Sequence, residues 1–411
     1  MRLRPLALGA ALSAMAFSGA LAQSTSSGGG GSGGAASSQR DLGFGAQVLV
    51  SYTDNAARAG KSVAVLRGLV SEDVTVTPTL SFRATQPIGQ QNLFASGSYG
   101  YQFHQHNKVL DRATVALNGG GSANFGRCQA TLTGSYQASQ ADIEDLDPLT
   151  TSNKRSSTRQ GVALQCGTPS GLGGNIAVQR GETKNSERRL RLNDSDSQSI
   201  SVGVGYSNST LGTVGVNYSY DSNAFPNLII PGRPIGDGYF NESIGVSAQR
   251  SFGRVSVDLA ASRFSLKREF APAGASAKLN GATYGGSVSY DLGTRISLTA
   301  GGSRSIRPSG RPGKVYDISK SMNAGIQYKL GSRIELSLDH TLAKTASNRD
   351  SLTPLLVITD ARLSSTSAAI LFTQSQKLTI GMTVRYDDRQ TNLPQFDYAA
   401  TSVGLRVGTS F

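Results

Sequence analysis

The sequence predicts an all-β protein, specifically a transmembrane antiparallel up-and-down β-barrel of about 18 strands. Three observations lead to this prediction. Apolar and polar residues alternate in stretches of about ten residues, connections alternate between short and long, and no apolar run reaches the roughly 20 residues that a membrane-spanning helix needs. Glycine supplies 49 of the 411 residues, and only 38% of the chain is hydrophobic. A soluble domain of this size would normally be richer in Leu and Ile.

The N-terminus has the features of a cleaved secretory signal peptide over residues 1–22. Arg2 and Arg4 form a positively charged start, a short apolar stretch follows, and residues 20–22 (Ala-Leu-Ala) fit a small-x-small cleavage site. The apolar stretch is too short for a membrane anchor. Removal of Arg2 and Arg4 leaves 38 basic residues against 27 acidic ones, so the mature chain carries a net charge near +11.

A Gly/Ser-rich segment over residues 23–41 is expected to be a disordered linker, and residues 42–411 are expected to form the barrel. Within the barrel, a period of two residues indicates strands with two chemically different faces. Residues 74–82, for example, place Val, Val, Leu and Phe among Thr and Ser. The predicted strands are 44–54, 74–85, 91–105, 111–126, 128–141, 157–167, 173–183, 198–209, 212–222, 239–252, 254–267, 280–292, 294–306, 315–330, 332–345, 361–374, 376–388 and 396–411.

The connections between these strands alternate along the chain. Eight are short, such as 125–127, 252–254 and 330–332, whereas the others are mostly long and polar. Related turns recur about every 40 residues, but each repeat holds two strands and a propeller blade would hold four. An even-numbered barrel with short periplasmic turns and long extracellular loops accounts for this pattern. Sixteen strands would also fit if two edge segments were wrongly counted.

The predicted closed barrel indicates a membrane location. A sheet can span lipid only as a closed barrel, because every backbone N–H and C=O must be paired within the protein. Eighteen strands enclose an interior too wide for side chains alone to fill. The sequence therefore predicts a water-filled channel for passive diffusion of small hydrophilic solutes, with no cofactor and no enzymatic activity. Barrels of this size occur singly or as trimers, and the oligomeric state is not predicted.

The C-terminus resembles the assembly signal of bacterial outer-membrane β-barrels. Phe411 ends the chain, and Val403, Leu405 and Val407 share its face of the last strand. Thr409 departs from the pattern, since an aromatic residue is commoner there. The resemblance implies a bacterial outer-membrane location and recognition by the barrel-assembly machinery.

A second resemblance concerns residues 50–55 (Val-Ser-Tyr-Thr-Asp-Asn) and residues 76–81 (Val-Thr-Pro-Thr-Leu-Ser). Together they look like the opening of β-barrel porins associated with exopolysaccharide systems. The likeness covers two strands and the general hairpin layout. It implies an alternative function, in which the barrel is an exopolysaccharide-associated or surface-interaction component without open-pore activity.

The charged positions predicted on the lumen side favour basic residues. Rings of Arg and Lys favour anions in a pore, so a weak preference for anions is expected. The alternative is that these charges neutralise one another along and across the strands. The candidate pore-lining residues are Arg83, Arg295, Lys329, Arg333, Glu335, Arg385 and Arg406.

The predicted outer loops contain a basic cluster of Arg188, Arg189 and Arg191, with Lys184 beside it and Lys154, Arg155 and Arg159 assigned to the preceding loop. Arginine clusters suit bidentate phosphate contacts, and lipopolysaccharide presents phosphates at that height. A solvated loop is the alternative, and nucleic acid is not an expected partner. Residues 224–231 are unusually apolar for an exposed loop, and are expected either to fold inward or to contact a partner.

Cys128 and Cys166 are predicted to meet on the lipid-facing side near the periplasmic rim, where an oxidising compartment permits a disulfide. His104 and His106 share one strand face, but two histidines without a third ligand are a weak metal signal. His340 and Asp339 are neighbours in a strand and therefore point to opposite faces. No catalytic or metal site is predicted.

Overall fold

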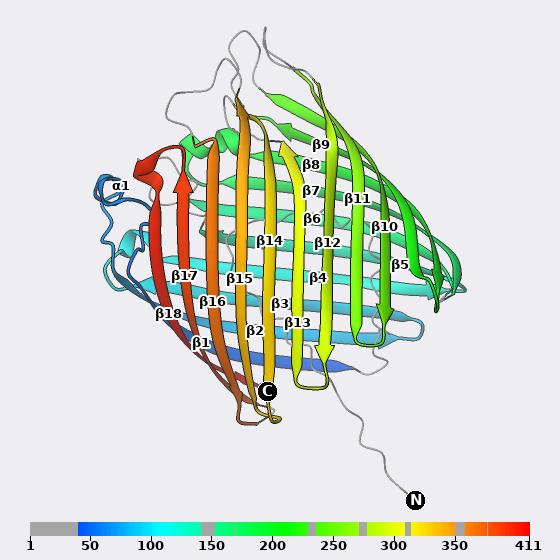
Figure 1. The fold of residues 1–411 in the computed structure, drawn as a ribbon, viewed down its shortest axis with the longest axis horizontal. Coiled ribbons are helices and arrows are strands. Elements are labelled where there is room, and N and C mark those ends of the chain that lie inside the picture. Colours follow the sequence, from blue (N-terminus) through cyan, green and yellow to red (C-terminus); the bar gives the residue numbers. More distant parts are fainter. Residues whose placement is uncertain are drawn as a thin grey trace, which may run out of the picture.

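The computed structural model describes residues 40–140, 153–168, 170–228, 236–270, 278–308, 314–349, 358–375 and 377–411. Within these residues, 18 strands form one antiparallel sheet in which each strand pairs with the next along the chain (Figure 1). The first strand also pairs with the last, so the sheet closes on itself and leaves no free edge. The fold class predicted from the sequence, an antiparallel barrel of 18 strands, is confirmed.

The strands are longer than the roughly 9–11 residues needed to cross a bilayer. Most of the extra length lies at the ends away from the short turns, where polar residues blur the alternation. Their bounds are β1 Asp41–Thr53, β2 Asp73–Ile88, β3 Gln91–His104, β4 Arg112–Phe125, β5 Cys128–Gln140, β6 Lys154–Gly167, β7 Gly171–Asn185, β8 Ser195–Asn208, β9 Gly212–Phe225, β10 Asp237–Phe252, β11 Val255–Arg268, β12 Lys278–Leu292, β13 Ile296–Pro308, β14 Lys314–Leu330, β15 Ile334–Arg349, β16 Asp360–Thr373, β17 Leu378–Thr391 and β18 Tyr398–Ser410.

The N-terminal predictions fall mostly outside the described residues. The signal peptide over residues 1–22 lies wholly outside them, and the linker over residues 23–41 lies outside them as far as residue 39. Strand β1 begins at Asp41, one residue before the expected start of the barrel. Asp41 joins the sheet because its backbone pairs with Thr85 of β2.

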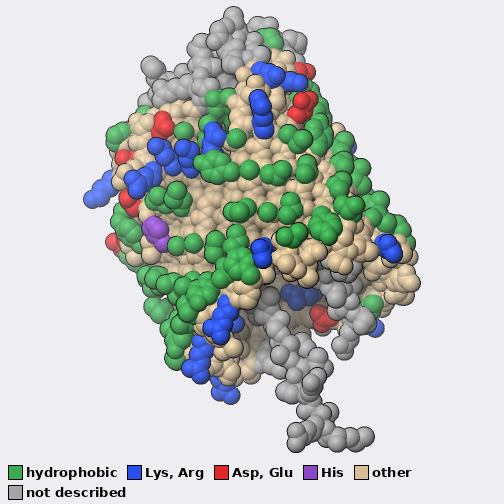
Figure 2. Space-filling view, turned by 45° about the vertical axis from the view of Figure 1, so that its right-hand side comes forward, with side chains coloured by type: hydrophobic (Ala, Val, Ile, Leu, Met, Phe, Trp, Pro, Cys, Tyr) green, Lys and Arg blue, Asp and Glu red, His purple; other side chains and the backbone are tan. Residues whose placement is uncertain are grey.

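The two faces of the sheet differ as the alternation predicts. Phe44 lies opposite Phe82, and Val50 lies opposite Val76, on the exterior. Figure 2 shows hydrophobic side chains in rows across this surface. The interior face carries small or polar partners, such as Asn118 opposite Ser135.

Glycine is required in several short turns, because the backbone there adopts the left-handed conformation that other residues adopt only with strain. Added Cβ atoms at these positions would meet no other atom, so conformation rather than space selects glycine. The glycines and their φ angles are Gly89 (61°), Gly126 (61°), Gly253 (61°), Gly293 (71°) and Gly331 (70°).

The opposite end of the barrel carries short helices that the sequence did not predict. The β1–β2 loop contains α1 (Lys61–Leu66), and three 3-10 helices follow in other loops: η1 (Lys108–Leu110), η3 (Arg188–Asn193) and η4 (Pro394–Phe396). Each is too short to produce a recognisable helical period. Among the described residues, no helix is both long and apolar enough to cross a membrane.

Candidate channel and its outer mouth

The interior wall holds several of the predicted pore-lining residues. Arg83 of β2 lies on the interior face between Gly43 and Ser96 and is exposed. Arg406 of β18 lies on the same face, opposite Gly381 of β17. Both cross-strand neighbours of Arg83 are small, whereas Arg406 has Gly381 on one side and Leu49 of β1 on the other.

The remaining wall charges are partly neutralised. The Nε atom of Arg385 lies 2.8 Å from Asp387 Oδ1, on the same face of β17. Lys329 lies opposite Glu335, but the Glu335 carboxylate accepts a hydrogen bond of 2.6 Å from Gln327 Nε2, and the described residues show no Lys329–Glu335 ion pair. Local neutralisation thus occurs at Arg385, whereas Glu335 is held by Gln327 and not by Lys329.

Two predicted lining residues do not lie on the wall. Arg295 precedes β13, which begins at Ile296, and Arg333 precedes β15, which begins at Ile334. The predicted strands began two residues too early in both places, because the turn residues continue the apparent alternation. Arg295 and Arg333 therefore lie in short turns at the rim and not along the wall.

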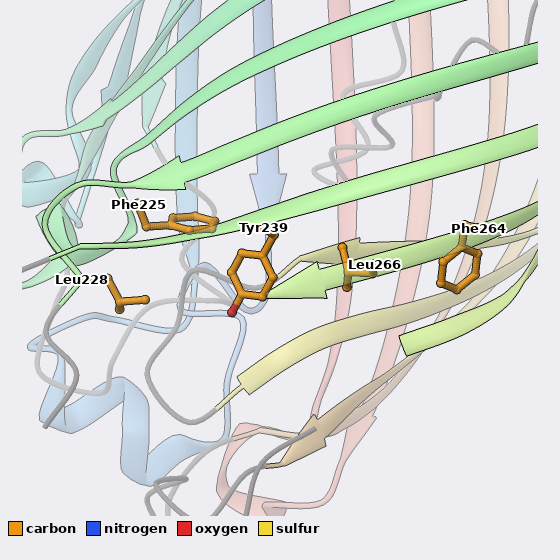
Figure 3. Packing of buried hydrophobic residues seen from close by; sticks show 5 residues of the cluster. All are labelled: Phe225, Leu228, Tyr239, Phe264 and Leu266. Atoms are coloured by element: carbon orange, nitrogen blue, oxygen red, sulfur yellow. The ribbon is translucent and has the colours of Figure 1, made fainter. Parts of the chain in front are cut away.

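An apolar cluster lines part of the interior near the loop end. Phe225, Leu228, Tyr239, Phe264 and Leu266 are each 7% exposed or less. Figure 3 shows Phe225, Leu228 and Tyr239 gathered together, with Leu266 and Phe264 following along β11. The register places Tyr239 and Leu266 on the interior face, where polar residues dominate elsewhere. These buried apolar residues show that the loop beginning at Phe225 turns inward as far as Leu228; residues 229–231 of the predicted apolar loop lie outside the described residues.

A buried ion pair accompanies this cluster. Arg268 Nε lies 2.7 Å from Asp237 Oδ2, and the two side chains are 5% and 0% exposed. The Arg268 guanidinium also lies over the Tyr239 ring, 5.7 Å from its centroid. Sequence reasoning missed this group because its members come from β10 and β11 and meet only through their register.

The β1–β2 loop packs against several other loops at the mouth. Ala57, Ala64 and Leu69 of this loop form a cluster with Leu110, against which Leu190 of η3 packs. A second cluster joins Ala59 and Val63 to Phe396, with Leu393 and Ile358 packed against it. The β1–β2 loop thus contacts loops that leave the barrel wall on both sides of it.

Asn107 fastens the β1–β2 loop to the β3–β4 loop. Its Oδ1 accepts a hydrogen bond of 2.8 Å from the Val70 backbone N–H, and its Nδ2 donates to Val70 O at 3.0 Å and to Asp73 Oδ2 at 2.9 Å. Asn107 is 3% exposed and Asp73 is 1% exposed. The Asp73 carboxylate also accepts from the backbone N–H of His106 at 3.0 Å.

The Tyr-Thr-Asp-Asn run at the end of β1 has a structural role in this mouth. Asp54 Oδ1 accepts a hydrogen bond of 2.7 Å from the backbone N–H of Thr401 in β18. Asn55 Nδ2 lies 3.3 Å from both Ala59 O and Ala399 O. These residues hold the start of the loop against the last strand.

The predicted outer-loop basic cluster divides into separate parts. Arg188, Arg189 and Arg191 lie together in η3 and are exposed. Arg155 and Arg159, assigned to a loop from the sequence, belong to β6, and their register places both on the interior face. The loop assignment was wrong for both: β6 begins at Lys154, three residues before the predicted strand 157–167, and that predicted strand already contained Arg159.

Lys154 and Lys184 lie on the exterior face of the barrel. Lys154 begins β6 and pairs with Gln140 on the exterior face. Lys184 lies in β7, and its Nζ is 2.5 Å from Glu182 Oε1 on the exterior face. Neither lysine faces the interior with Arg155 and Arg159.

Cys128 and Cys166 lie opposite one another on β5 and β6 and form a disulfide, with an S–S distance of 2.09 Å. Leu132 and Val162, which share their faces, are 59% and 54% exposed on the exterior. The bridge therefore joins two strands on the outer surface near the short turn at Gly126.

The rings of His104 and His340 form hydrogen bonds, whereas the His106 ring lies near a carboxylate but beyond hydrogen-bonding distance of it. His104 Nδ1 lies 3.3 Å from Asp111 Oδ1, and His106 Nδ1 lies 3.8 Å from Asp73 Oδ1. His340 contacts Thr366 Oγ1 at 2.9 Å on the exterior, whereas Asp339 lies on the interior opposite Gly325. No group of three or more metal-ligating side chains is present in the described part of the chain.

No protein-family model and no curated protein matches the sequence. Solved structures do match. Pseudomonas aeruginosa OccK2 (OpdF) is 11% identical, with a TM-score of 0.51, over 91% of this chain and 98% of that one. OccK2 in complex with glucuronate gives 12% identity, a TM-score of 0.50 and the same coverage. OccK9 (OpdG) of P. aeruginosa gives 12% identity and a TM-score of 0.50 over 91% of this chain and 99% of that one. At these identities, the likeness establishes a shared barrel fold for this chain.

Proposed function

We propose that this protein is a bacterial outer-membrane channel for passive diffusion of small hydrophilic solutes. The observation that carries the proposal is a closed 18-stranded barrel with apolar rows outside and small or polar residues inside. Only a closed barrel can place strands in lipid with every backbone group paired. A barrel of this strand number leaves an interior that its wall cannot fill.

Export and assembly complete this proposal. A cleaved signal peptide over residues 1–22 would deliver the chain to the periplasm, and the barrel-assembly machinery would recognise Val403, Leu405, Val407 and Phe411. Leu405 and Val407 are exposed on the exterior, and the backbone of Phe411 exchanges hydrogen bonds with Phe44 of β1 at 2.8 and 3.2 Å. The terminal aromatic residue thus lies at the seam where the barrel closes.

The proposed selectivity is a weak preference for anions, supported by exposed Arg83 and by Arg406 on the interior wall. The OccK2 structure with glucuronate is that of a barrel of the same fold with a small carboxylated solute. As part of the proposal, we infer that the solutes of this chain are small and hydrophilic and include carboxylates.

Planar-bilayer recording tests both statements. The purified barrel is expected to give steady open-pore conductance, and a salt gradient is expected to give a reversal potential that favours anions. Arg83→Gln should reduce that preference, whereas Arg250→Gln, which alters a cation on the exterior face near the short turns, should leave it unchanged. A silent barrel would refute the channel, and a cation-favouring reversal potential would refute the selectivity alone.

The second candidate is an exopolysaccharide-associated or surface-interaction barrel without open-pore activity. The packing of the β1–β2 loop against other loops at the mouth favours this candidate, because such packing can occlude a pore. Absence of conductance together with retention of labelled polysaccharide by the purified barrel would support it. Steady conductance unaffected by polysaccharide would exclude it.

A further inference from the structure

A row of basic residues crosses four adjacent strands on the exterior of the barrel. The register sets Arg304 of β13 opposite Lys320 of β14, Lys320 opposite Lys344 of β15, and Lys344 opposite Arg362 of β16. Exterior residues such as Met322 and Leu338 share the faces of Lys320 and Lys344, and both are about half exposed or more. The row therefore points away from the channel. With strands about 4.8 Å apart, it spans roughly 14 Å.

No acidic residue in the described part of the chain forms an ion pair with this row. Lys320, Lys344 and Arg362 are exposed, and none forms an ion pair within the part of the chain that the structure describes. Two carboxylates lie near Arg362 on the same face: Asp360, two residues earlier on β16, and Asp388 of β17, which pairs with Ser364. Neither forms an ion pair with Arg362 in the described residues. Like charges directly opposite one another destabilise a sheet. The presence of four such residues in successive strands points to an anion supplied from outside the barrel.

The height of the row matches the border of the apolar band. On β14, the exterior residues Met322, Ile326 and Leu330 lie between Lys320 and the short turn. Ten residues along a strand tilted by about 40° rise by roughly 26 Å, close to the thickness of the apolar band of outer-membrane barrels. In Figure 2, Lys and Arg side chains gather above the rows of hydrophobic side chains on this surface. The row thus lies where the headgroups of the outer leaflet would be.

A groove adjoins the row on the same surface. It has a volume of about 700 Å³ and runs along β10 to β12, between Ile244 and Val246 on one side and Tyr284 on the other. Ala261 and Ala282 form its floor, because their side chains are shorter than those of their neighbours. Its lining is largely apolar, which suits an acyl chain.

Two arginines flank the upper end of this groove. Arg263 lies directly opposite Ala282 and is exposed. Arg304 Nη1 donates a hydrogen bond to Ala282 O from the other side, at the point where pairing between β12 and β13 ends. The upper end of this apolar surface groove therefore lies beside Arg304, the first cation of the row.

We propose that Arg263, Arg304, Lys320, Lys344 and Arg362 bind the phosphate groups of an outer-leaflet glycolipid, with one acyl chain in the groove along β10 to β12. Arginine forks suit bidentate phosphate contacts, and lysines supply additional point charges. The site is distinct from the η3 arginines and from the channel wall. It rests on the proposed outer-membrane location, but it does not require an open pore.

The test uses the full-length barrel purified in a non-ionic detergent and titrated with bisphosphorylated lipid A, with bound lipid counted by native mass spectrometry. Lys320→Gln combined with Lys344→Gln is expected to weaken binding by about 25-fold, or about fivefold for each charge removed. Ala261→Phe, which fills the groove without changing charge, should also weaken binding. Arg250→Gln is the matched control, because Arg250 is an exposed exterior cation near the opposite rim, 5.4 Å from the Phe252 ring.

Dephosphorylated lipid A provides the second arm. This lipid is expected to bind the unaltered barrel weakly. Its affinity should be about the same as that of bisphosphorylated lipid A for the double lysine variant. Equal binding of the two lipids, or equal loss in Arg250→Gln and the double variant, would overturn the proposal. If the barrel forms dimers without lipid, and these dimers dissociate when the lysines are substituted, the row is a contact between two copies and the lipid proposal is overturned. Conductance recorded on the same samples separates this outcome from failure of the channel proposal, because the row lies outside the pore.

Discussion

Asn107 offers a sharp test of how the outer mouth is held together. Asn107→Ala removes three side-chain hydrogen bonds, two to the backbone of Val70 and one to Asp73. A typical hydrogen bond contributes about 1 kcal/mol, and two of the three bonds reach the β1–β2 loop, so docking of that loop should weaken by about 2 kcal/mol. The carboxylate of Asp73 keeps its bond from the backbone of His106, so strand β2 should stay in register.

Hydrogen exchange followed by mass spectrometry measures this loss directly. A change of about 2 kcal/mol corresponds to roughly 30-fold more frequent opening. The backbone N–H of Val70 loses its acceptor in the variant, so peptides covering residues 61–72 should exchange faster by up to that factor. Lys108→Ala is the control, because Lys108 is exposed and adjacent but takes no part in these bonds. The unfolding midpoint should change little, since the barrel wall is untouched.

The channel should respond as well. If the β1–β2 loop narrows the mouth, Asn107→Ala should raise the mean open-pore conductance relative to Lys108→Ala. Equal exchange of residues 61–72 in both variants would refute the anchoring role of Asn107. Faster exchange with unchanged conductance would retain the anchor but show that this loop does not limit flow.

Three further predictions concern stability. Replacing Cys128 and Cys166 by serine should lower the free energy of unfolding by up to about 4 kcal/mol, because the bridge closes a segment of 38 residues. Conductance should not change, since the bridge lies outside the channel. An unchanged denaturation midpoint, or no mass shift on reduction and alkylation of the parent protein, would contradict this prediction. Gly331→Val should cost about 1–2 kcal/mol through backbone strain alone, since φ is 70° and no atom lies near its Cβ position; a midpoint equal to that of the parent would contradict it. Asp237→Asn should cost about 3–5 kcal/mol because it breaks the buried ion pair between Arg268 Nε and Asp237 Oδ2, and simultaneous Arg268→Met should recover part of that loss. A double variant less stable than the single one would contradict this reasoning.

The strand order could be predicted from the sequence because its physical basis is local. In a strand with lipid on one face and water on the other, apolar and polar residues alternate regardless of which strands lie beside it. Residues 74–82 and 403–407 show this pattern. The turn glycines are equally local, since a positive φ is a property of one residue. Strand ends were less well predicted, and Arg295 and Arg333 were placed on the wall for that reason.

The candidate sites depend on register, which the sequence does not display. Lys320 and Lys344 are separate surface charges in the sequence, 24 positions apart, and become adjacent only when β14 pairs with β15. The apolar cluster around Tyr239 likewise combines β9, β10 and β11. Buried Asn107 could not be recognised either, because its partners Val70 and Asp73 lie more than 30 residues earlier.

In the proposed channel, the register also limits how strongly the net charge can act on permeating ions. Lys320, Lys344, Arg362 and Arg263 contribute to the positive balance of the chain, but they lie on the exterior, beyond the barrel wall from any ion in the channel. Inside, Arg385 is paired with Asp387, and the η3 arginines are at the solvent-exposed mouth, where salt screens them within about 10 Å. The proposed anion preference therefore rests on a few wall residues such as Arg83 and Arg406. It should be modest, should fall as ionic strength rises, and should be insensitive to substitutions in the exterior row.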